Sequence, residues 1–284
     1  MNAMHQVPDV NREQAALWNG AAAHAWADEQ ALLDRMFQPF EDLLVETAVT
    51  RGASRVLDIG CGTGATTLAI ARGIGTAGEC TGVDISEPLL VSARARAAHE
   101  KSAARFVLAD AQAHAFAPTS VDLVVSRFGV MFFDDPVAAF TNLRRTVREG
   151  GSMRVIAFRS VTENPFMTTA ERAVGPLLPN LPPRQADAPG QFAFADEGRV
   201  RGILTGSGWR NVDIEPLDVH CVFPAQDLSR YVTRFGPVGL VLQQADERTR
   251  TQVLEKLGAA FAPYVAGGDV RFTAACWSIS AETP

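Results

Sequence analysis

The sequence predicts an α/β protein with a mostly parallel sheet, and three observations carry this prediction. An apolar strand at 55–60 leads into a glycine turn, and a helix at 64–73 follows at once. Strands and helices then alternate along the chain, and one more strand lies near the C-terminus. Strands joined by helices of about ten to fifteen residues form parallel sheets with right-handed crossovers, and such sheets bind ligands at their carboxyl ends.

A helical stretch at 11–50 comes first. We expect Asn11 to cap its first helix and Pro39 to break or kink its last one. Strands are predicted at 55–60, 79–85, 104–109, 121–126, 152–158, 212–223 and 270–280. Helices are predicted at 64–73, 87–101, 136–148 and 196–207. Ser86 is the expected cap of the second of these helices, and Gly150-Gly151 is the expected end of the third.

The glycine turn contains Gly60, Gly62 and Gly64 within five positions. Glycines let the backbone turn tightly and let a ligand approach where a Cβ would block it. The helix that follows points its free N–H groups toward whatever lies over the turn. Gly60, Gly62 and Ala65 also satisfy the dinucleotide pattern G-x-G-x-x-G/A, so the turn alone does not identify its ligand.

Two carboxylates limit which ligand the glycine turn can bind. Asp58 precedes the first glycine by two residues, where it would repel a pyrophosphate and hold an ammonium group. Asp84 ends the next strand, where it can accept hydrogen bonds from both hydroxyls of a ribose and disfavours a 2′-phosphate. We therefore expect a ligand with a ribose and an ammonium group, and NADP is the least favoured candidate.

At these residues the chain resembles the class I S-adenosylmethionine (SAM)-dependent methyltransferases, within them the small-molecule group of ubiquinone and menaquinone C-methyltransferases. The resemblance covers residues 50–160 closely. Its segments are Val56-Leu57-Asp58-Ile59-Gly60-Cys61-Gly62-Thr63-Gly64, Val83-Asp84-Ile85-Ser86, Phe106-Val107-Leu108-Ala109-Asp110-Ala111, Val121-Asp122-Leu123-Val124-Val125-Ser126 and Arg148-Glu149-Gly150-Gly151.

The resemblance implies a Rossmann-like sheet of seven strands with helices on both faces and an antiparallel C-terminal strand. It also implies SAM as cofactor and S-adenosylhomocysteine as product. Asp110 would accept the adenine amino group, although a helix-cap aspartate is the alternative, and Ile85 would pack on the adenine face. The expected cofactor-binding residues are Asp58, Gly60, Cys61, Gly62, Gly64, Asp84, Ile85, Asp110, Ala111, Ser126, Trp18 and Trp26.

We expect one methyltransferase domain over 1–284, with a SAM-binding core at 51–158. Residues 1–50 would form a helical lid, on which Trp18 and Trp26 either pack on the cofactor or anchor the helices. Residues 159–195 are rich in proline and apolar side chains, and 225–268 are mainly helical; both segments are expected to be insertions that build a substrate pocket.

Composition limits the possible partners. A net charge of −6 and a pI near 5.4 argue against a nucleic-acid-binding face. Residues 1–10 show no signal pattern, and no apolar run approaches a membrane span. The four cysteines lack metal-ligand spacing, so we expect a cytoplasmic protein without a structural metal. The oligomeric state, monomer or homodimer, stays open.

The sequence says least about the residues that bind the methyl acceptor. The segment after strand 121–126 is apolar, which favours a small apolar or aromatic acceptor held by Phe128, Met131 and Phe132. Tyr231 and Arg234, one helical turn apart, could bind a polar group of this acceptor. His24 and Tyr231 are candidate bases, if a base is needed at all.

The expected function is methyl transfer from SAM to carbon, oxygen or nitrogen by in-line displacement. Two alternatives stay open: a SAM-binding protein that transfers no methyl group, and a nucleotide-dependent oxidoreductase.

Overall fold

The computed structural model describes residues 11–185 and 188–284, so the first ten residues of the expected lid, including the segment examined for a signal pattern, lie outside it. Three helices precede the sheet: α1 (Arg12–Trp18), α2 (Ala21–Asp28) and α3 (Gln30–Thr50). The parallel strands are β1 (Arg55–Ile59), β2 (Glu79–Asp84), β3 (Arg105–Leu108), β4 (Val121–Arg127) and β5 (Val147–Phe158). Helices α4 (Ala65–Ile74), α5 (Glu87–Glu100) and α6 (Pro136–Thr146) lie between them in sequence.

The strands form one sheet in the order β3-β2-β1-β4-β5-β8-β6. Strands β1 to β5 run parallel, whereas β8 (Asp269–Glu282) pairs antiparallel with β5 and with β6 (Arg210–Pro224). A two-residue strand, β7 (Val265–Ala266), pairs with β8 beside this path. The seven-strand order and the antiparallel C-terminal strand confirm the predicted fold class.

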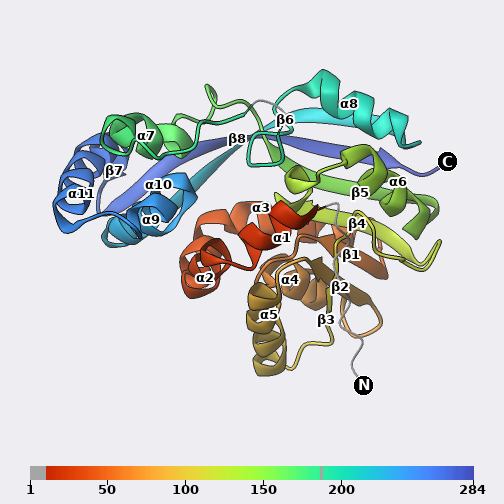
Figure 1. Cartoon of the computed structure of the whole chain (residues 1–284). Helices are drawn as coiled ribbons and strands as arrows, with labels where there is room; N and C mark the ends of the chain where they lie inside the picture. Colours follow the sequence, from red (N-terminus) through yellow and green to blue (C-terminus); the bar gives the residue numbers. More distant parts are fainter. Residues whose placement is uncertain (1–10, 186–187) are drawn as a thin grey trace.

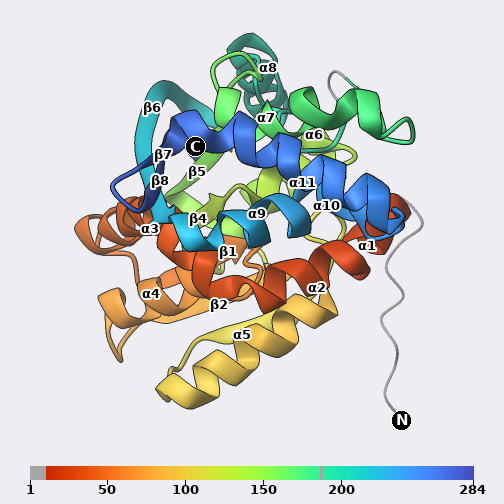
Figure 2. The same ribbon diagram turned by 90° about the vertical axis from the view of Figure 1, so that its left-hand side faces the viewer.

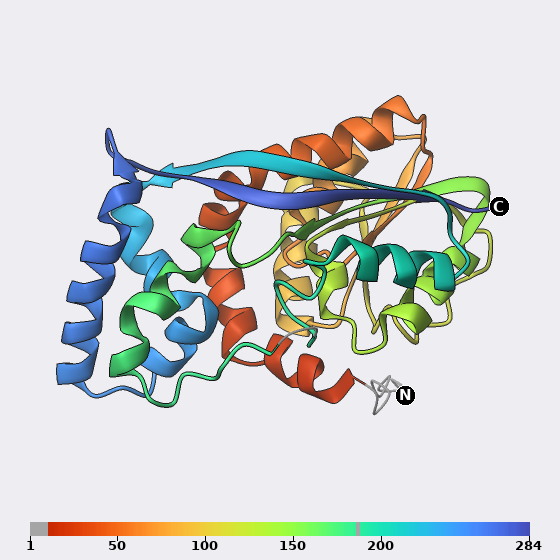
Figure 3. The ribbon, with the colours of Figure 1, turned by 90° about the horizontal axis from the view of Figure 1, so that it is seen from above.

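Helices cover both faces of the sheet. Figure 3 shows α3 on one side of the β6–β8 ribbon, and α6 with α8 (Glu197–Gly206) on the other. Helix α5 packs against β2 and β3, and α8 packs against β6. Ser86 caps α5 as predicted, since its Oγ accepts from Leu89 N at 3.3 Å, and Asp135 Oδ1 caps α6 by accepting from Ala138 N at 2.9 Å. The carboxyl ends of β1 to β4 therefore open on one edge of a covered sheet, as parallel topology requires.

Strands β6 and β8 are much longer than the parallel strands β1 to β4 and reach beyond them (Figures 1 and 3). Their far ends carry a helical cluster of α7 (Pro165–Val174), α9 (Leu228–Arg234), α10 (Gly236–Leu242) and α11 (Glu247–Phe261). Figure 2 shows α9 and α10 facing α1 and α2 across the carboxyl edge of the sheet. The two expected insertions thus meet each other and face the N-terminal helices.

The boundary between α6 and β5 differs from the prediction. Gly150 and Gly151 lie inside β5 rather than ending the helix, because Val147 already pairs with Val121. The register then shifts, so that Leu123 pairs with Ser152. Gly150 has a φ of +66°, which lets the extra residues loop out of the ladder.

Two predictions on the N-terminal helices differ from the structure in part. Pro39 does not break α3, which continues from Gln30 to Thr50. One face of α3 buries Met36, Phe40 and Leu44, and this packing holds the helix together despite the missing backbone hydrogen bond. Asn11 occupies the N-cap position of α1, but its side chain makes no capping hydrogen bond.

Within 11–185 and 188–284, no helix combines the length and the apolar character that crossing a membrane requires.

Candidate active site

The glycine turn after β1 has the backbone shape that the sequence predicts. Gly60, Gly62 and Gly64 have φ angles of +65°, +55° and +84°, a region that disfavours residues with a Cβ. Gly60 also lies against Gly129: a Cβ on Gly60 would stand 2.6 Å from the Gly129 Cα. The turn therefore depends on glycine for its conformation and for its close contact with the segment after β4.

Asp84 at the end of β2 is bound to this turn. Its Oδ2 accepts from Gly62 N at 2.8 Å, and its Oδ1 accepts from Ser86 N at 2.9 Å. Burial raises the pKa of Asp84, while these backbone donors act in the opposite direction. Each carboxylate oxygen has a second acceptor site, so Asp84 retains capacity for hydroxyl donors from a ligand.

Asp110 follows β3 and is buried. Its Oδ1 accepts from Gln112 N at 2.9 Å, whereas its Oδ2 is buried and has no hydrogen-bond partner among the described residues. A buried acceptor without a donor is unfavourable unless a ligand supplies one. Asp110 therefore fits an amino-group donor from the cavity that it lines.

A single cavity of about 620 Å³ joins these groups to the helical cluster. Thirteen of the residues predicted to bind cofactor or substrate line it: Trp18, Trp26, Gly60, Gly62, Asp84, Ile85, Asp110, Ala111, Phe128, Met131, Phe132, Tyr231 and Arg234. The wall continues over apolar side chains of α3, α7 and α10, among them Met36, Phe37, Phe166, Val238 and Val241. One end of the cavity is thus polar and acidic, and the other is apolar and aromatic.

Four of the predicted cofactor residues lie behind this wall. Ser126 Oγ donates to Ile59 O at 2.7 Å and accepts from Gly129 N at 3.0 Å, so it joins the ends of β1 and β4. Cys61 and Gly64 are buried on the far side of the turn, where Gly64 packs on Phe106. These residues shape the turn, and their direct contact with a cofactor stays a prediction.

Asp58 is the fourth, and its surroundings differ from those expected of an ammonium ligand. It is 1% exposed, and Thr67 Oγ1 donates to its Oδ2 at 2.6 Å. Burial raises the pKa of Asp58 to about 7, although Thr67 and Arg127 both act to lower it. Within 11–185 and 188–284, its Oδ1 has no hydrogen-bond partner. Asp58 is therefore joined to α4 and does not line the cavity, and its direct contact with a cofactor stays a prediction.

The N-terminal helices close over the cavity through aromatic contacts. The Trp18 ring lies 5.1 Å from Phe132 and 5.7 Å from Trp26, and the Trp26 ring lies 6.0 Å from Phe235, all in edge-to-face pairs. Asn19 Nδ2 donates to Ile85 O at 3.1 Å, which ties α1 to the end of β2. Both tryptophans therefore line the cavity and also anchor the lid.

Ion pairs join the same lid to α9. Arg230 pairs with Glu29, and Arg234 pairs with Asp28, so the carboxyl end of α2 is bound twice to α9. Glu29 has only 8% of its side chain exposed. Arg234 thus lies at the cavity wall, as predicted, but its charge is already paired with the lid.

The two candidate bases are not supported. His24 is exposed on α2 and is not part of the cavity wall. Tyr231 lies in the wall and donates to Met167 Sδ at 3.6 Å. Burial raises the pKa of Tyr231, which keeps its hydroxyl protonated. Tyr231 is therefore suited to donate a hydrogen bond and unsuited to remove a proton.

Several residues of the cavity wall were not predicted from the sequence. Glu171 on α7 and Arg184 form a two-point ion pair, with Nε–Oε2 at 2.8 Å and Nη2–Oε1 at 2.5 Å. Gln14 and Asn11 on α1 also reach the wall. Arg127 ends β4 with a mostly buried guanidinium, and the one signal for it in the sequence is a charged residue directly after an apolar strand.

Comparison with known proteins agrees with this geometry. Residues 56–151 match the family model described as a methyltransferase domain. The chain is 32% identical over 188 residues to an uncharacterised protein of Mycobacterium tuberculosis, Rv1405c, and the match spans 65% of each chain, slightly less than two thirds. It is 33% identical over 101 residues to a demethylmenaquinone methyltransferase of Staphylococcus aureus, covering 36% of this chain and 42% of that protein.

A solved structure shares the fold at low sequence identity. A phosphoethanolamine N-methyltransferase 2 of Haemonchus contortus, in complex with phosphomonomethylethanolamine and S-adenosylhomocysteine, superposes with a TM-score of 0.56 at 16% identity. The superposition covers 98% of this chain and 61% of that one.

The sheet order, the glycine turn and the acidic residues at the ends of β2 and β3 define an α/β protein of the methyltransferase fold. Residues 56–151 are similar to the methyltransferase-domain family.

Proposed function

We propose that this protein transfers a methyl group from SAM to a small, largely apolar or aromatic acceptor. The observation that carries the proposal is the single cavity that runs from Asp84 and Asp110 to the apolar wall of α7 and α10. Such a cavity offers one polar end for a nucleoside and one apolar end for a second molecule. The named methyltransferases among the relatives and structural neighbours support the same reaction class.

At the polar end, this chain's own groups match the nucleoside. Asp84 would accept hydrogen bonds from the ribose hydroxyls, and Asp110 Oδ2 would accept from the adenine amino group. Ile85 and Leu89 supply apolar surface to the same cavity. Gly60 and Gly62 leave room for the ligand to pass along the turn.

SAM supplies a methyl group on a positively charged sulfur, which needs no further activation by the protein. The task of the chain is then to align the acceptor and to exclude water, and orientation of this kind can lower a barrier by about 7 kcal/mol in the best cases. Trp18, Trp26 and Phe132 cover the cavity, while Phe128 stacks on Phe158 at 4.5 Å in the wall.

The described wall contains no histidine, and apart from Asp84 and Asp110, which this proposal assigns to the cofactor, its ionisable groups are poorly suited to remove a proton. Glu171 is engaged by Arg184, and Tyr231 stays protonated. We therefore propose an acceptor that reacts as an uncharged nucleophile or as an anion that it forms readily by itself. Tyr231 would hold the polar group of this acceptor by donating a hydrogen bond.

The test is calorimetric titration of SAM and S-adenosylhomocysteine into the wild type and Asp84→Asn. Hydrogen bonds to a charged group contribute ~1.5–3 kcal/mol each, so the variant should bind about tenfold more weakly or worse. Asp213→Asn, an exposed position on β6, is the matched control and should bind like the wild type. Binding of NADH in place of SAM would instead favour an oxidoreductase.

Methyl transfer itself is tested by incubating the wild type with SAM and a panel of small aromatic and apolar nucleophiles. Formation of S-adenosylhomocysteine that depends on one of these acceptors supports the proposal. Tight SAM binding without turnover on any acceptor would favour a SAM-binding protein that transfers no methyl group.

A further inference from the structure

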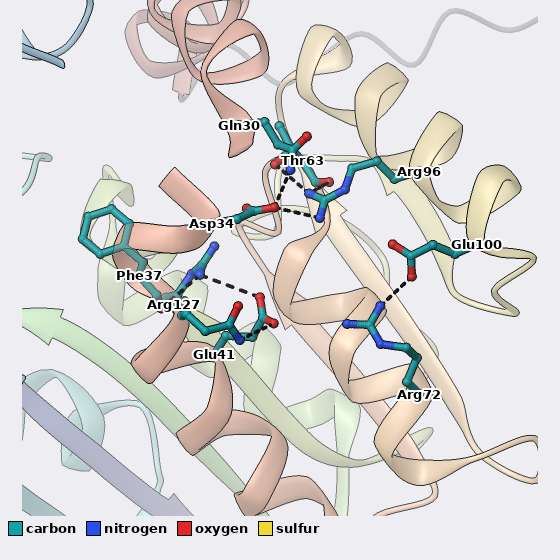
Figure 4. Close-up of polar contacts among 10 residues, drawn as sticks. Gln30, Asp34, Phe37, Glu41, Thr63, Arg72, Arg96, Glu100 and Arg127 are labelled. Atoms are coloured by element: carbon teal, nitrogen blue, oxygen red, sulfur yellow. Dashed lines mark hydrogen bonds and ion pairs between the residues drawn. The ribbon is translucent and has the colours of Figure 1, made fainter. Parts of the chain in front are cut away.

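Arg127 is a mostly buried cation that makes few hydrogen bonds, although its charge also acts on Asp58. It ends β4, lines the cavity and has 14% of its side chain exposed. Its Nη1 donates to Phe37 O at 3.4 Å and lies 4.0 Å from Glu41 Oε2. Figure 4 shows the guanidinium reaching toward α3 between these two residues. Both contacts are long, and both use the same nitrogen.

A guanidinium has five N–H donors and is costly to bury unless an anion or several acceptors satisfy it. Within the described residues, Nε and Nη2 of Arg127 make no hydrogen bond, and Glu41 lies beyond hydrogen-bond distance. Glu41 Oε1 also accepts from Gln38 Nε2 at 3.0 Å. The free donors of Arg127 therefore fit an anionic group that enters from the cavity.

The order of the strands indicates which anion this is. Strands β3, β2, β1 and β4 are adjacent in this order, and at their carboxyl ends lie Asp110, Asp84, the glycine turn and Arg127. If Asp110 holds the adenine and Asp84 the ribose, the amino-acid end of the cofactor extends over the turn toward β4. This end carries the one carboxylate of SAM, and it would lie beside the one arginine that ends a strand in this series.

We infer that Arg127 binds the carboxylate of the methionine moiety of SAM. The inference rests on the proposed function, because it needs the cofactor in this cavity. The other arginines of the wall are poorer candidates: Arg184 is held by Glu171, and Arg234 is held by Asp28. Arg127 thus selects the intact amino-acid end of the cofactor and, through Phe37 and Glu41, links it to α3.

The experiment compares two ligands that differ in one group: S-adenosylhomocysteine, and its decarboxylated analogue in which hydrogen replaces the carboxylate. Calorimetry gives both affinities for the wild type, Arg127→Gln and Arg127→Lys. The wild type should prefer S-adenosylhomocysteine by about tenfold or more, since a charged hydrogen bond is lost with the carboxylate. Arg127→Gln should bind the two ligands with about equal affinity, and Arg127→Lys should retain part of the preference.

Arg72→Gln is the matched control, because Arg72 on α4 pairs with Glu100 (Figure 4) and neither residue lines the cavity. Its ligand preference should equal that of the wild type. Unchanged binding of the decarboxylated ligand to Arg127→Gln shows that this variant is folded.

Three outcomes would overturn the inference. If Arg127→Gln keeps the wild-type preference, another group binds the carboxylate. Equal affinity of the wild type for both ligands would mean that no group of the protein binds the carboxylate. Arg127 would then serve an anionic acceptor. If the wild type binds neither ligand, this inference fails together with the proposed function.

Discussion

The backbone N–H of Gly62 donates to the carboxylate of Asp84 across 2.8 Å, so the end of β2 holds the turn that follows β1. Neighbouring parallel strands bring these two residues together although 22 positions separate them. The carboxylate that is expected to hold the ribose thereby also sets the shape of the glycine turn. Substitutions in the turn should therefore affect binding and stability together.

The contact between Gly60 and Gly129 predicts a steric effect. A Cβ on Gly129 would stand 2.5 Å from Ile59 O and 2.7 Å from Gly60 Cα, which the backbone cannot accommodate without moving. Gly129→Ala should lower the free energy of unfolding by ~1–3 kcal/mol and weaken SAM binding. Urea denaturation and calorimetry measure the two effects.

Gly202→Ala is the control for this change. Gly202 lies in α8, and a Cβ there meets nothing within 4 Å. Replacing a helical glycine with alanine should leave binding unchanged and stabilise the protein by roughly 0.5–1 kcal/mol. Equal stabilities of Gly129→Ala and the wild type would contradict the contact.

Asp58 should make stability depend on pH. Its pKa is about 7 in the folded state and 3.8 in the reference state, so the folded protein binds the extra proton between these values. The protonated form is neutral and tolerates burial, and stability from this group is therefore highest below pH 3.8 and falls as pH rises to about 7. Above pH 7, where Asp58 is ionised in both states, its contribution to stability no longer changes with pH.

Asp58→Asn removes this titration and keeps an acceptor for Thr67. The variant should gain stability relative to the wild type as pH rises from 4 to 7, by up to about 4 kcal/mol. Urea denaturation of both proteins at several pH values measures the difference. A difference that does not vary with pH would show that Asp58 is ionised throughout.

The ion pairs between α2 and α9 should slow the opening of the N-terminal lid. Glu29→Gln weakens the pair with Arg230 and leaves the size of the side chain unchanged. Loss of this pair should raise the dissociation rate of S-adenosylhomocysteine a few-fold, in line with a contribution of about 1 kcal/mol for a partly exposed pair. Stopped-flow tryptophan fluorescence can follow the release through Trp18 and Trp26.

Glu197→Gln is the control for the lid, since Glu197 pairs with Arg201 within α8. Its dissociation rate should match the wild type at all salt concentrations. Added salt should accelerate release from the wild type and have little effect on Glu29→Gln. If Glu29→Gln releases the ligand at the wild-type rate, the ion pairs do not hold the lid.

Tyr231 should act on the acceptor and not on the cofactor. Tyr231→Phe removes one hydroxyl donor, which should raise the KM for the acceptor by about 2- to 10-fold and leave SAM affinity unchanged. Because burial raises the pKa of Tyr231, the pH–rate profile should keep its shape. Tyr264→Phe is the control, as the Tyr264 hydroxyl lies near Thr169, 3.3 Å away, outside this cavity.

The parts of the fold that the sequence predicted correctly depend on neighbours in the chain. The strand, turn and helix at 55–73 follow from apolar periodicity and from glycines that occupy positive φ. Parallel topology then places Asp84 and Asp110 at the same edge of the sheet, so their presence in one cavity could be expected. The boundary at Gly150 was wrong because pairing with β4 overrides the tendency of glycine to end a helix.

Packing between segments far apart in the sequence decided the features of the site that the sequence did not predict. Asp28 meets Arg234 across 206 positions, and Glu29 meets Arg230 across 201, so no local pattern could predict that these side chains join the lid to α9. Burial separates the lining residues Trp18 and Tyr231 from the exposed His24, and it raises the pKa of Asp58. Local periodicity and strand order are properties of the chain, whereas burial, charge pairing and the wall of the acceptor site arise only when distant segments pack together.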